Sequence, residues 1–462
     1  MIIALTVIFF IICISAFNWK QSFYFVVVFL VLEGAVRKWI FPQASEFIYF
    51  LKDLVLIGAY FNFYFINSNK TKNHYINILI YWLAIWTFIQ AFAPSLGSSV
   101  VGFFGLRAYL LYIPLIWMFP DLFPSKTELY KFIRNYSLLI IPVCLLAVIQ
   151  FFSPPSSPLN VYAAGGDTVA TFGVGEESTV RVTGSFSYIT GFGTYLCTSF
   201  TLLIPLLKLR QSLTWYWLTI IELLLVTGTS FMTGSRAVVF YEALFLISYA
   251  LILLLTQPKH AIRNIQKFIL PIVIVAVLVP TYFSKSINLF SERSTANSTE
   301  MVTRIWQPFT EPFSTLNQII ESKLIDSYGT GATHQATPKL RKFLNLPKGD
   351  TVPASGEIEA PRLILEIGAF GFILWYSIRI ALIVSLFLTF RKLRDPFLQQ
   401  LALSAFLFNA IQIIVPVVFN PTMGIYYWIL GGFIFLLTEL EKREYKYFYY
   451  QQSDDSYSLI EK

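Results

Sequence analysis

Five basic residues lie in or beside strongly apolar stretches of this chain, and they are the residues best suited to do chemistry. They are Arg236, Arg181, Arg107, Arg37 and Lys38. A permanent cation near a lipid interior is energetically unfavourable, so by default it marks a site that binds something negative or polar. We therefore expect the functional site of this protein to be built around these side chains.

The composition predicts the environment that must position these cations. Of 462 residues, 56% are hydrophobic and only 13% are charged, whereas soluble domains carry about 25% charged residues. Apolar runs of roughly 20 residues predict membrane-spanning helices. They are too long, and alternate too little, for barrel strands. We expect an all-α, polytopic transmembrane bundle with about 12 to 13 spans.

Thirteen apolar segments are candidate spans, and the first two could together form one re-entrant unit. The segments are 2–17, 21–36, 46–66, 75–93, 99–119, 135–152, 184–207, 214–232, 237–256, 268–283, 361–390, 397–418 and 422–440. They divide the chain into N-terminal helices (1–152), a first outer loop (153–183), central helices (184–283), a large outer loop (284–360), C-terminal helices (361–440) and a cytoplasmic tail (441–462).

Lysine and arginine in the short connections predict the orientation, because such residues collect on the cytoplasmic side. Placing the C-terminus inside assigns most basic loops to the cytoplasm and both long loops to the outer side. The N-terminus then lies outside if all thirteen segments cross. Arg37, Lys38, Arg181 and Arg236 fall on the outer side against this rule, and Arg107 lies about ten residues, or roughly 15 Å, inside its span.

The large outer loop is long enough to be functional. Within it, residues 298–310 and 314–326 resemble two short amphipathic helices, with Trp306, Ile319, Ile320 and Leu324 as apolar anchors. A glycine-rich turn follows at residues 328–331, and His334 comes just after it.

Several arginines that converge at an outer membrane surface suit a pyrophosphate, because guanidinium pairs with phosphate oxygens through two hydrogen bonds and keeps its charge. A lipid-linked sugar pyrophosphate presents such a group at this depth. Transfer of its glycan needs cations for the leaving group and a base for the acceptor hydroxyl. The sequence contains no metal or Walker motif and no Cys/His cluster, so we expect neither a metal nor a soluble cofactor.

Four motifs resemble those of O-antigen polymerases and O-antigen ligases. Residues 181–186 (RVTGSF) are similar to a family motif that opens a span, and residues 233–236 (TGSR) to the family's Thr-Gly-Ser-Arg-Gly, with Ala237 in place of the last glycine. Arg304, with Trp306 nearby, precedes the Gly-x-Gly turn, as in the family. Residues 365–371 (LEIGAFG) then resemble its Leu-x-Glu-x-Gly-x-x-Gly. The resemblance covers roughly residues 181–390.

This resemblance implies the fold of C-type, lipid-phosphate-dependent glycosyltransferases in a bacterial cytoplasmic membrane. It implies a glycan polymerase that works without metal on a lipid-pyrophosphate-linked oligosaccharide and partners with other glycan-assembly proteins, such as a chain-length regulator, but not with nucleic acid. Arg236, Arg181 and Arg304 would then hold the donor pyrophosphate, while Arg107 and the Arg37–Lys38 pair would line the cavity.

The candidate general base departs from the family pattern. Ligases of the family carry a His followed by Asn, Ser or Gln, with nine residues between this pair and Gly-x-x-Gly. Here residues 359–367 fill that interval before Gly368, and Glu357 holds the His position. A carboxylate can also accept the proton, and His334 is a second candidate. This departure favours a polymerase, or a divergent glycan transferase, over a ligase.

Each of these residues also has a structural interpretation. Arg236 could extend to the interface, Arg181 could belong to a polar loop, and Arg37 and Lys38 could anchor a helix at the interface. Arg107 could pair with Glu33 or Asp53. Glu357 and Glu359 could meet the positive end of a helix dipole, and His334 could be a solvated loop residue.

Two other classes of function remain open. A transporter or flippase could use buried arginines for an anionic solute, although the sequence lacks paired broken helices and inverted halves. A scaffolding protein would tolerate removal of the charges at Arg181 and Arg236.

Overall fold

The computed structural model describes residues 2–67, 74–163, 169–172, 179–209, 211–256, 258–296, 298–323, 327–353 and 358–460. These residues are mostly helical, and among them one antiparallel ribbon is formed by β1 (Thr171–Phe172) and β2 (Thr179–Val180). The α-helices are α1 (Ile2–Ser15), α2 (Trp19–Ala35), α3 (Ser45–Phe61), α4 (Tyr75–Gln90), α5 (Ser99–Leu110), α6 (Leu115–Met118), α7 (Lys126–Ser137), α8 (Ile140–Phe152), α9 (Ile189–Lys208), α10 (Leu213–Met232), α11 (Arg236–Thr256), α12 (Pro258–Tyr282), α13 (Ser284–Ala296), α14 (Ser298–Lys323), α15 (Thr337–Leu344), α16 (Glu359–Lys392), α17 (Pro396–Ile411), α18 (Pro421–Gly431) and α19 (Phe433–Ile460).

Short π- or 3-10 turns join several of these helices. They are η1 (Val36–Ile40), η2 (Pro42–Ala44), η3 (Asn62–Ile66), η4 (Pro94–Leu96), η5 (Phe119–Leu122) and η7 (Gln412–Ile414). The turn η1 continues α2 and carries Arg37 and Lys38.

Within the described residues, nine helices are long and apolar enough to cross a membrane. They are Pro42–Ile66, Ser99–Leu122, Lys126–Phe152, Ile189–Lys208, Leu213–Met232, Arg236–Thr256, Glu359–Lys392, Pro396–Ile414 and Pro421–Lys446. The chain is thus a multi-pass membrane protein, and the all-helical prediction is confirmed.

The prediction of thirteen spans is wrong, because four of the apolar segments do not form one long, apolar helix. The first segment forms the short α1, and α4 has only 16 residues. The second forms α2, whose apolar run ends at Glu33 and the basic η1. Near residue 283 the chain bends by 81° between Leu270–Tyr282 and Ser284–Glu292, so this pair is at most one tenth span.

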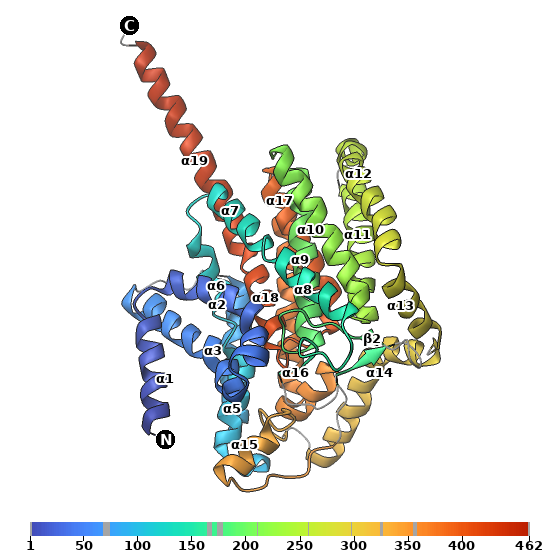
Figure 1. Cartoon of the computed structure of the whole chain (residues 1–462). Helices are drawn as coiled ribbons and strands as arrows, with labels where there is room; N and C mark the ends of the chain where they lie inside the picture. The colour runs from blue at the N-terminus through green and yellow to red at the C-terminus, as the bar shows by residue number, and fades with distance from the viewer. Residues whose placement is uncertain are drawn as a thin grey trace.

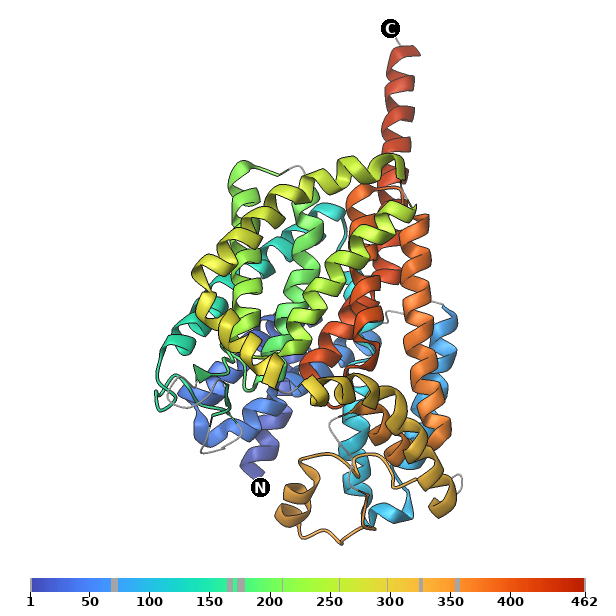
Figure 2. The same ribbon diagram turned by 90° about the vertical axis from the view of Figure 1, so that its right-hand side faces the viewer.

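The long helices stand side by side, and the segments expected outside lie at one end of the bundle (Figures 1 and 2). Helices α14 and α15 lie at the end opposite α19, which extends beyond the bundle. The central helix α9 carries Thr194, Thr198 and Thr201, and the hydroxyl of each donates to the backbone carbonyl four residues earlier. These bonds satisfy polar groups inside an apolar core.

The large loop does not contain two short amphipathic helices in its first half. One helix, α14, spans Ser298–Lys323 and includes Pro308 and Pro312. The predicted break between residues 310 and 314 is absent, because a proline such as Pro312 can kink a helix without ending it. Ile319 is buried and packs with Ile364 and Leu365 of α16, whereas Trp306 and Ile320 are exposed; Leu324 lies outside the described residues.

Helix α16 is interrupted at Gly368, inside the motif at residues 365–371. Gly368 has φ 68° and ψ −178°, a conformation that is essentially restricted to glycine. The carbonyl of Ile367 accepts a hydrogen bond from the indole nitrogen of Trp86 at 2.7 Å. The motif at residues 365–371 therefore forms a break within a long helix, and the helix itself begins at Glu359.

We expect Gly368→Ala to lower the stability of the protein by about 1–3 kcal/mol, because a Cβ strains this backbone conformation. Gly191→Ala is the control, since Gly191 lies inside α9 and an added Cβ there would make ordinary contacts no closer than 3.4 Å. Thermal unfolding in detergent measures both variants. An unfolding temperature of Gly368→Ala as high as that of Gly191→Ala would contradict the strained conformation.

Candidate functional site

The segment that joins β2 to α9 lies against the turn between α10 and α11. The Nε of Arg181 donates to the carbonyl of Thr233 at 2.9 Å, and the amide of Val182 donates to the carbonyl of Met232 at 3.4 Å. Gly184 and Gly234 have positive φ angles of 52° and 60°, which glycine adopts without strain. Two motifs separated by about fifty residues therefore meet in one place.

Arg236 begins α11 three residues after Thr233, and part of its charge has no acceptor. Its Nη1 atom is buried and makes no hydrogen bond to any of the residues that the structure describes. Leaving a buried charged donor unsatisfied costs about 1–3 kcal/mol or more. An anionic ligand at this end of α11 would remove that penalty.

Lys38 and Arg37 reach the same segment from the end of α2. The Nζ of Lys38 donates to Thr183 Oγ1 at 3.0 Å and to the carbonyl of Gly184 at 2.8 Å. The Nη1 of Arg37 donates to Ser187 Oγ at 2.9 Å. The approach requires glycine at position 34, because a Cβ there would lie 2.2 Å from the backbone nitrogen of Ser187.

Lys38 is buried, and among the described residues its amine donates to neutral oxygens and pairs with no carboxylate. Burial lowers the pKa of its amine from 10.5 to about 7, because desolvation disfavours the charged form. Its Nζ also lies 4.4 Å from the centroid of the Trp39 ring, a favourable cation–π contact. The charge of Lys38 therefore changes near neutral pH.

The ring of Tyr49 connects these residues to Arg107. The guanidinium carbons of Arg37 and Arg107 lie 5.0 and 5.2 Å from its centroid, and Lys52 Nζ lies 4.3 Å away. The Nε of Arg107 donates to Asp53 Oδ2 at 2.6 Å. Of the two carboxylates considered for Arg107, the structure therefore selects Asp53.

Cations outnumber carboxylates in this assembly, which we call the cation cluster. Its basic members are Arg37, Lys38, Lys52, Arg107, Arg181 and Arg236, and its acidic members are Glu33 and Asp53. Glu33 binds both Arg37 and Lys52, at 3.1 and 2.7 Å. The carboxylates thus hold the part of the cluster near Tyr49. Among the described residues, Lys38 binds the neutral oxygens of Thr183 and Gly184, and the Nη1 atom of Arg236 has no acceptor.

His334 lies at the edge of this region but is poorly suited to act as a base. Its Nδ1 accepts a hydrogen bond from the amide of Ala336 at 3.1 Å, so the neutral ring carries its proton on Nε2. Burial and the positive charges of Arg107 and Arg362 lower the pKa of His334 to about 4. At neutral pH the ring is therefore neutral, and it is a weak proton acceptor whose Nδ1 is already engaged by the Ala336 amide.

Glu366, from the motif in α16, holds the glycine-rich turn in place. Its carboxylate accepts hydrogen bonds from the Gly331 amide, from the amide and hydroxyl of Thr333, and from Tyr109 Oη, at 2.7–2.9 Å. Arg362 donates to the carbonyl of Thr333 at 2.9 Å and lies over the ring of Phe419. The turn and the α16 motif therefore form one structural unit.

We expect Glu366→Gln to loosen this turn. The carboxylate of Glu366 accepts all of its hydrogen bonds, whereas the NH₂ group of a glutamine would itself be a donor and would face other donors. One unsatisfied buried group costs about 1–3 kcal/mol, so tryptic cleavage at Lys339 should accelerate about tenfold. Tyr109→Phe is the matched control, because it removes only one of the four hydrogen bonds and should change cleavage less. Equal cleavage of wild type and Glu366→Gln would show that this carboxylate does not restrain the turn.

Two predicted site residues cannot be placed in this geometry. Glu357 lies outside the described residues, as does the side chain of Arg304, although its backbone belongs to α14. Glu359 has a structural role: it pairs with Arg379 at 2.7 Å and accepts from the amides of Val417 and Val418. Both members of this ion pair are fully buried.

Sequence reasoning missed several buried charges. Lys52 and Glu366 contribute to the site, while Arg134 pairs with Glu222 at 2.6 Å inside the bundle. Glu242 is buried and accepts from Ser230 Oγ at 2.6 Å. Each is an ionisable residue inside an apolar segment, which is the signal that identified the arginines and could have identified these too.

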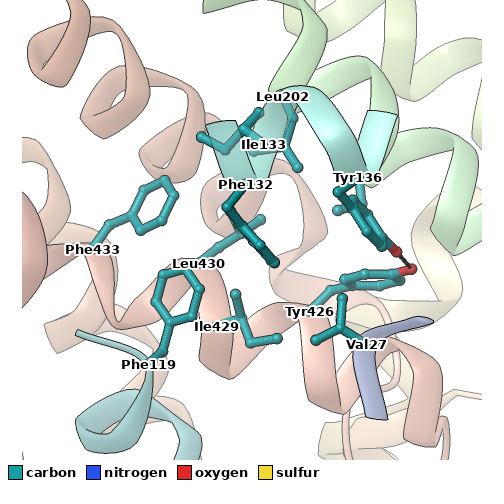
Figure 3. A pocket seen from close by; sticks show the side chains of 11 residues that line it. Val27, Phe119, Phe132, Ile133, Tyr136, Leu202, Tyr426, Ile429, Leu430 and Phe433 are labelled. Carbon is teal, nitrogen blue, oxygen red and sulfur yellow. Dashed lines mark hydrogen bonds between the residues drawn. The ribbon is translucent and has the colours of Figure 1, made fainter. Parts of the chain in front are cut away.

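A small apolar gap lies between α7, α9 and α18 and is unsuited to a glycan (Figure 3). Its volume is about 30 Å³, roughly that of one water molecule. Phe132, Ile429 and Leu430 line it, beside the hydrogen-bonded hydroxyls of Tyr136 and Tyr426.

Within the part of the chain that the structure describes, no group of three His, Cys, Asp or Glu side chains could hold a metal ion. Comparison with protein-family models, with curated proteins and with solved structures found no match to this chain.

Proposed function

We propose that this protein transfers a glycan from a lipid-pyrophosphate donor to an acceptor sugar hydroxyl at the outer face of a bacterial cytoplasmic membrane. The observation that carries the proposal is the meeting of residues 181–187 with the turn at residues 232–236, where Lys38 binds neutral oxygens and the buried Nη1 of Arg236 has no acceptor among the described residues. Such a group of donors in a membrane protein suits an anionic ligand that carries more than one charge.

The proposed reaction exchanges one bond at the anomeric carbon of the donor. The bond from that carbon to the pyrophosphate oxygen breaks, and a bond to the acceptor oxygen forms. The lipid pyrophosphate leaves with the bonding electrons, and the cation cluster stabilises its growing negative charge. The acceptor proton passes to a base, for which Glu357 is the better candidate because the tautomer and pKa of His334 disfavour that residue.

The product class follows from the same departure at Glu357. We favour polymerisation of a lipid-linked oligosaccharide, as in exopolysaccharide or O-antigen assembly, over ligation to a different lipid acceptor. The long outer segment that carries α14 and α15 would cover the site and exclude water, since hydrolysis of the donor competes with transfer.

The test supplies the purified protein, in lipid nanodiscs, with an oligosaccharide linked to a polyprenyl pyrophosphate. Products longer than the donor repeat, released together with free polyprenyl pyrophosphate, would support the proposal. Movement of the unchanged donor across a proteoliposome membrane, without longer products, would show that the protein is a flippase and not a transferase. If neither longer products nor donor movement is detected, both functions are contradicted.

A further inference from the structure

Glu242 is a carboxyl group inside the helical bundle that forms no ion pair with any of the described residues. It lies on α11, six residues after Arg236, and is 5% exposed. Ser230 Oγ of the neighbouring helix α10 donates to its Oε1 at 2.6 Å. Because Arg236–Thr256 is one of the spanning helices, this carboxyl group lies at the level of the membrane.

The residues around Glu242 do not supply a positive charge. Helices α10 and α17 contain no lysine or arginine, and Arg236 is the only basic residue of α11. The titratable groups that interact electrostatically with Glu242 are Cys144 of α8, Cys197 of α9 and Tyr241 of α11. Thiols and phenols are either neutral or negatively charged, so none of these groups can balance an ionised carboxylate.

The hydrogen bonds of Glu242 also favour the neutral acid. A carboxylate inside a membrane is unfavourable unless it is paired or accepts several hydrogen bonds. Ser230 has one hydroxyl hydrogen to offer, and its Oγ also lies 2.9 Å from the carbonyl of Val226, a second acceptor for the same hydrogen. A carboxyl group that carries its own proton needs no more than this single donor.

Ser230 also belongs to the bonded structure of the turn that precedes Arg236. Its carbonyl accepts from Thr233 Oγ1 at 2.7 Å, and the carbonyl of Thr233 accepts from Arg181 Nε at 2.9 Å. Helices α10 and α11 run side by side on either side of this turn (Figures 1 and 2). The contact between Glu242 and Ser230 therefore joins the two helices next to the turn that presents two members of the cation cluster.

We infer that Glu242 is a proton-binding site and a positioning residue, which as a neutral carboxylic acid holds the start of α11 and therefore Arg236 in place for an anionic ligand. Ionisation would put a negative charge about 9 Å along the helix from Arg236, at 1.5 Å per residue. Proton binding and anion binding then favour each other, because such coupling is reciprocal. The positioning role rests on the proposed function, whereas the protonated state does not.

Two substitutions separate the neutral acid from the carboxylate in the full-length protein in nanodiscs. Glu242→Gln keeps a neutral side chain of similar shape that can still accept from Ser230, whereas Glu242→Leu removes the acceptor. Glu439→Gln is the control, because Glu439 is a partly exposed carboxylate that pairs with Arg443. The two measurements at pH 7 are the infrared band of protonated carboxylic acids and the binding of inorganic pyrophosphate.

We expect Glu242→Gln to lose intensity in this infrared band and Glu439→Gln to leave the band unchanged. Binding of pyrophosphate by Glu242→Gln should stay within about twofold of wild type. Glu242→Leu should bind pyrophosphate about threefold to tenfold more weakly, which corresponds to the loss of one hydrogen bond.

An unchanged infrared band in Glu242→Gln would overturn the proton-binding site, because the carboxyl group would then be ionised in the wild type. Equal weakening of pyrophosphate binding in Glu242→Gln and Glu242→Leu would overturn the role of the neutral acid, and unchanged binding in Glu242→Leu would overturn the positioning role. If the wild type binds no pyrophosphate, the proposed function and the positioning role are both contradicted, while the infrared comparison still decides the proton-binding site.

Discussion

Replacement of Arg236 by Ala is expected to lower glycan transfer by about 10²- to 10³-fold, the usual effect of removing one donor that stabilises a developing negative charge. The buried Nη1 of Arg236 lacks an acceptor among the described residues, so an anionic ligand that accepts from it would remove an unfavourable desolvation free energy. The measurement is the rate of product extension by purified protein, with the amount of membrane-inserted protein determined in parallel.

Two further variants make this result specific. Arg236→Lys keeps the charge but loses the planar pair of donors, so its activity should lie between those of wild type and Arg236→Ala. Arg443→Ala removes an exposed arginine that pairs with Glu439 in α19, far along the chain from the cation cluster, and should leave transfer unchanged. Normal extension by Arg236→Ala would overturn the assignment of this residue to the donor site.

Lys38→Met should weaken pyrophosphate binding and remove part of its pH dependence. The pKa of Lys38 is about 7 in the folded protein, so its charged fraction falls roughly fivefold between pH 7 and pH 8. Binding of an anion by wild type should therefore decline over this interval more steeply than binding by Lys38→Met. Pyrophosphate also titrates, but its contribution is the same for both proteins. The difference between the two binding profiles therefore reports the titration of Lys38 alone.

Anion binding should weaken as the pH rises, whereas the contribution of Lys38 to the free energy of unfolding should increase. In the unfolded chain the amine keeps its proton up to about pH 10.4, whereas the folded chain releases it near pH 7. Between these values the unfolded chain binds more protons, so this amine makes the folded protein more stable as the pH rises. Lys38→Met should lack this contribution. Parallel stability profiles of the two proteins from pH 7 to pH 10 would show that Lys38 is not held in its buried position.

The apolar runs were sufficient to predict a helical membrane protein, but not the number of its spans. Runs such as 75–93 predicted helices correctly, yet α4 has only 16 residues. The hydropathy pattern contains no sign of the 81° bend between α12 and α13. It also does not show that α14 continues through Pro312.

Part of the candidate site could be predicted because cations in apolar surroundings are conspicuous. Arg37, Lys38, Arg181 and the segment that leads to Arg236 lie together, as expected, although their roles remain predictions. For Arg107 the sequence left two carboxylates, Glu33 and Asp53, as possible partners. The structure shows a pair with Asp53, and this choice depends on the fold, which spacing along the chain does not reveal. The partners of Glu366 lie on α5 and in the outer loop, so spacing along the chain gave no sign of them.

The most direct test of the cation cluster is a cryo-electron microscopy structure of the full chain in nanodiscs with a polyprenyl pyrophosphate. We expect phosphate oxygens within hydrogen-bond distance of Arg236 and of at least one of Lys38 and Arg181. Pyrophosphate density elsewhere, with Lys38 still bound to Thr183 and Arg181 still bound to Thr233, would contradict the account.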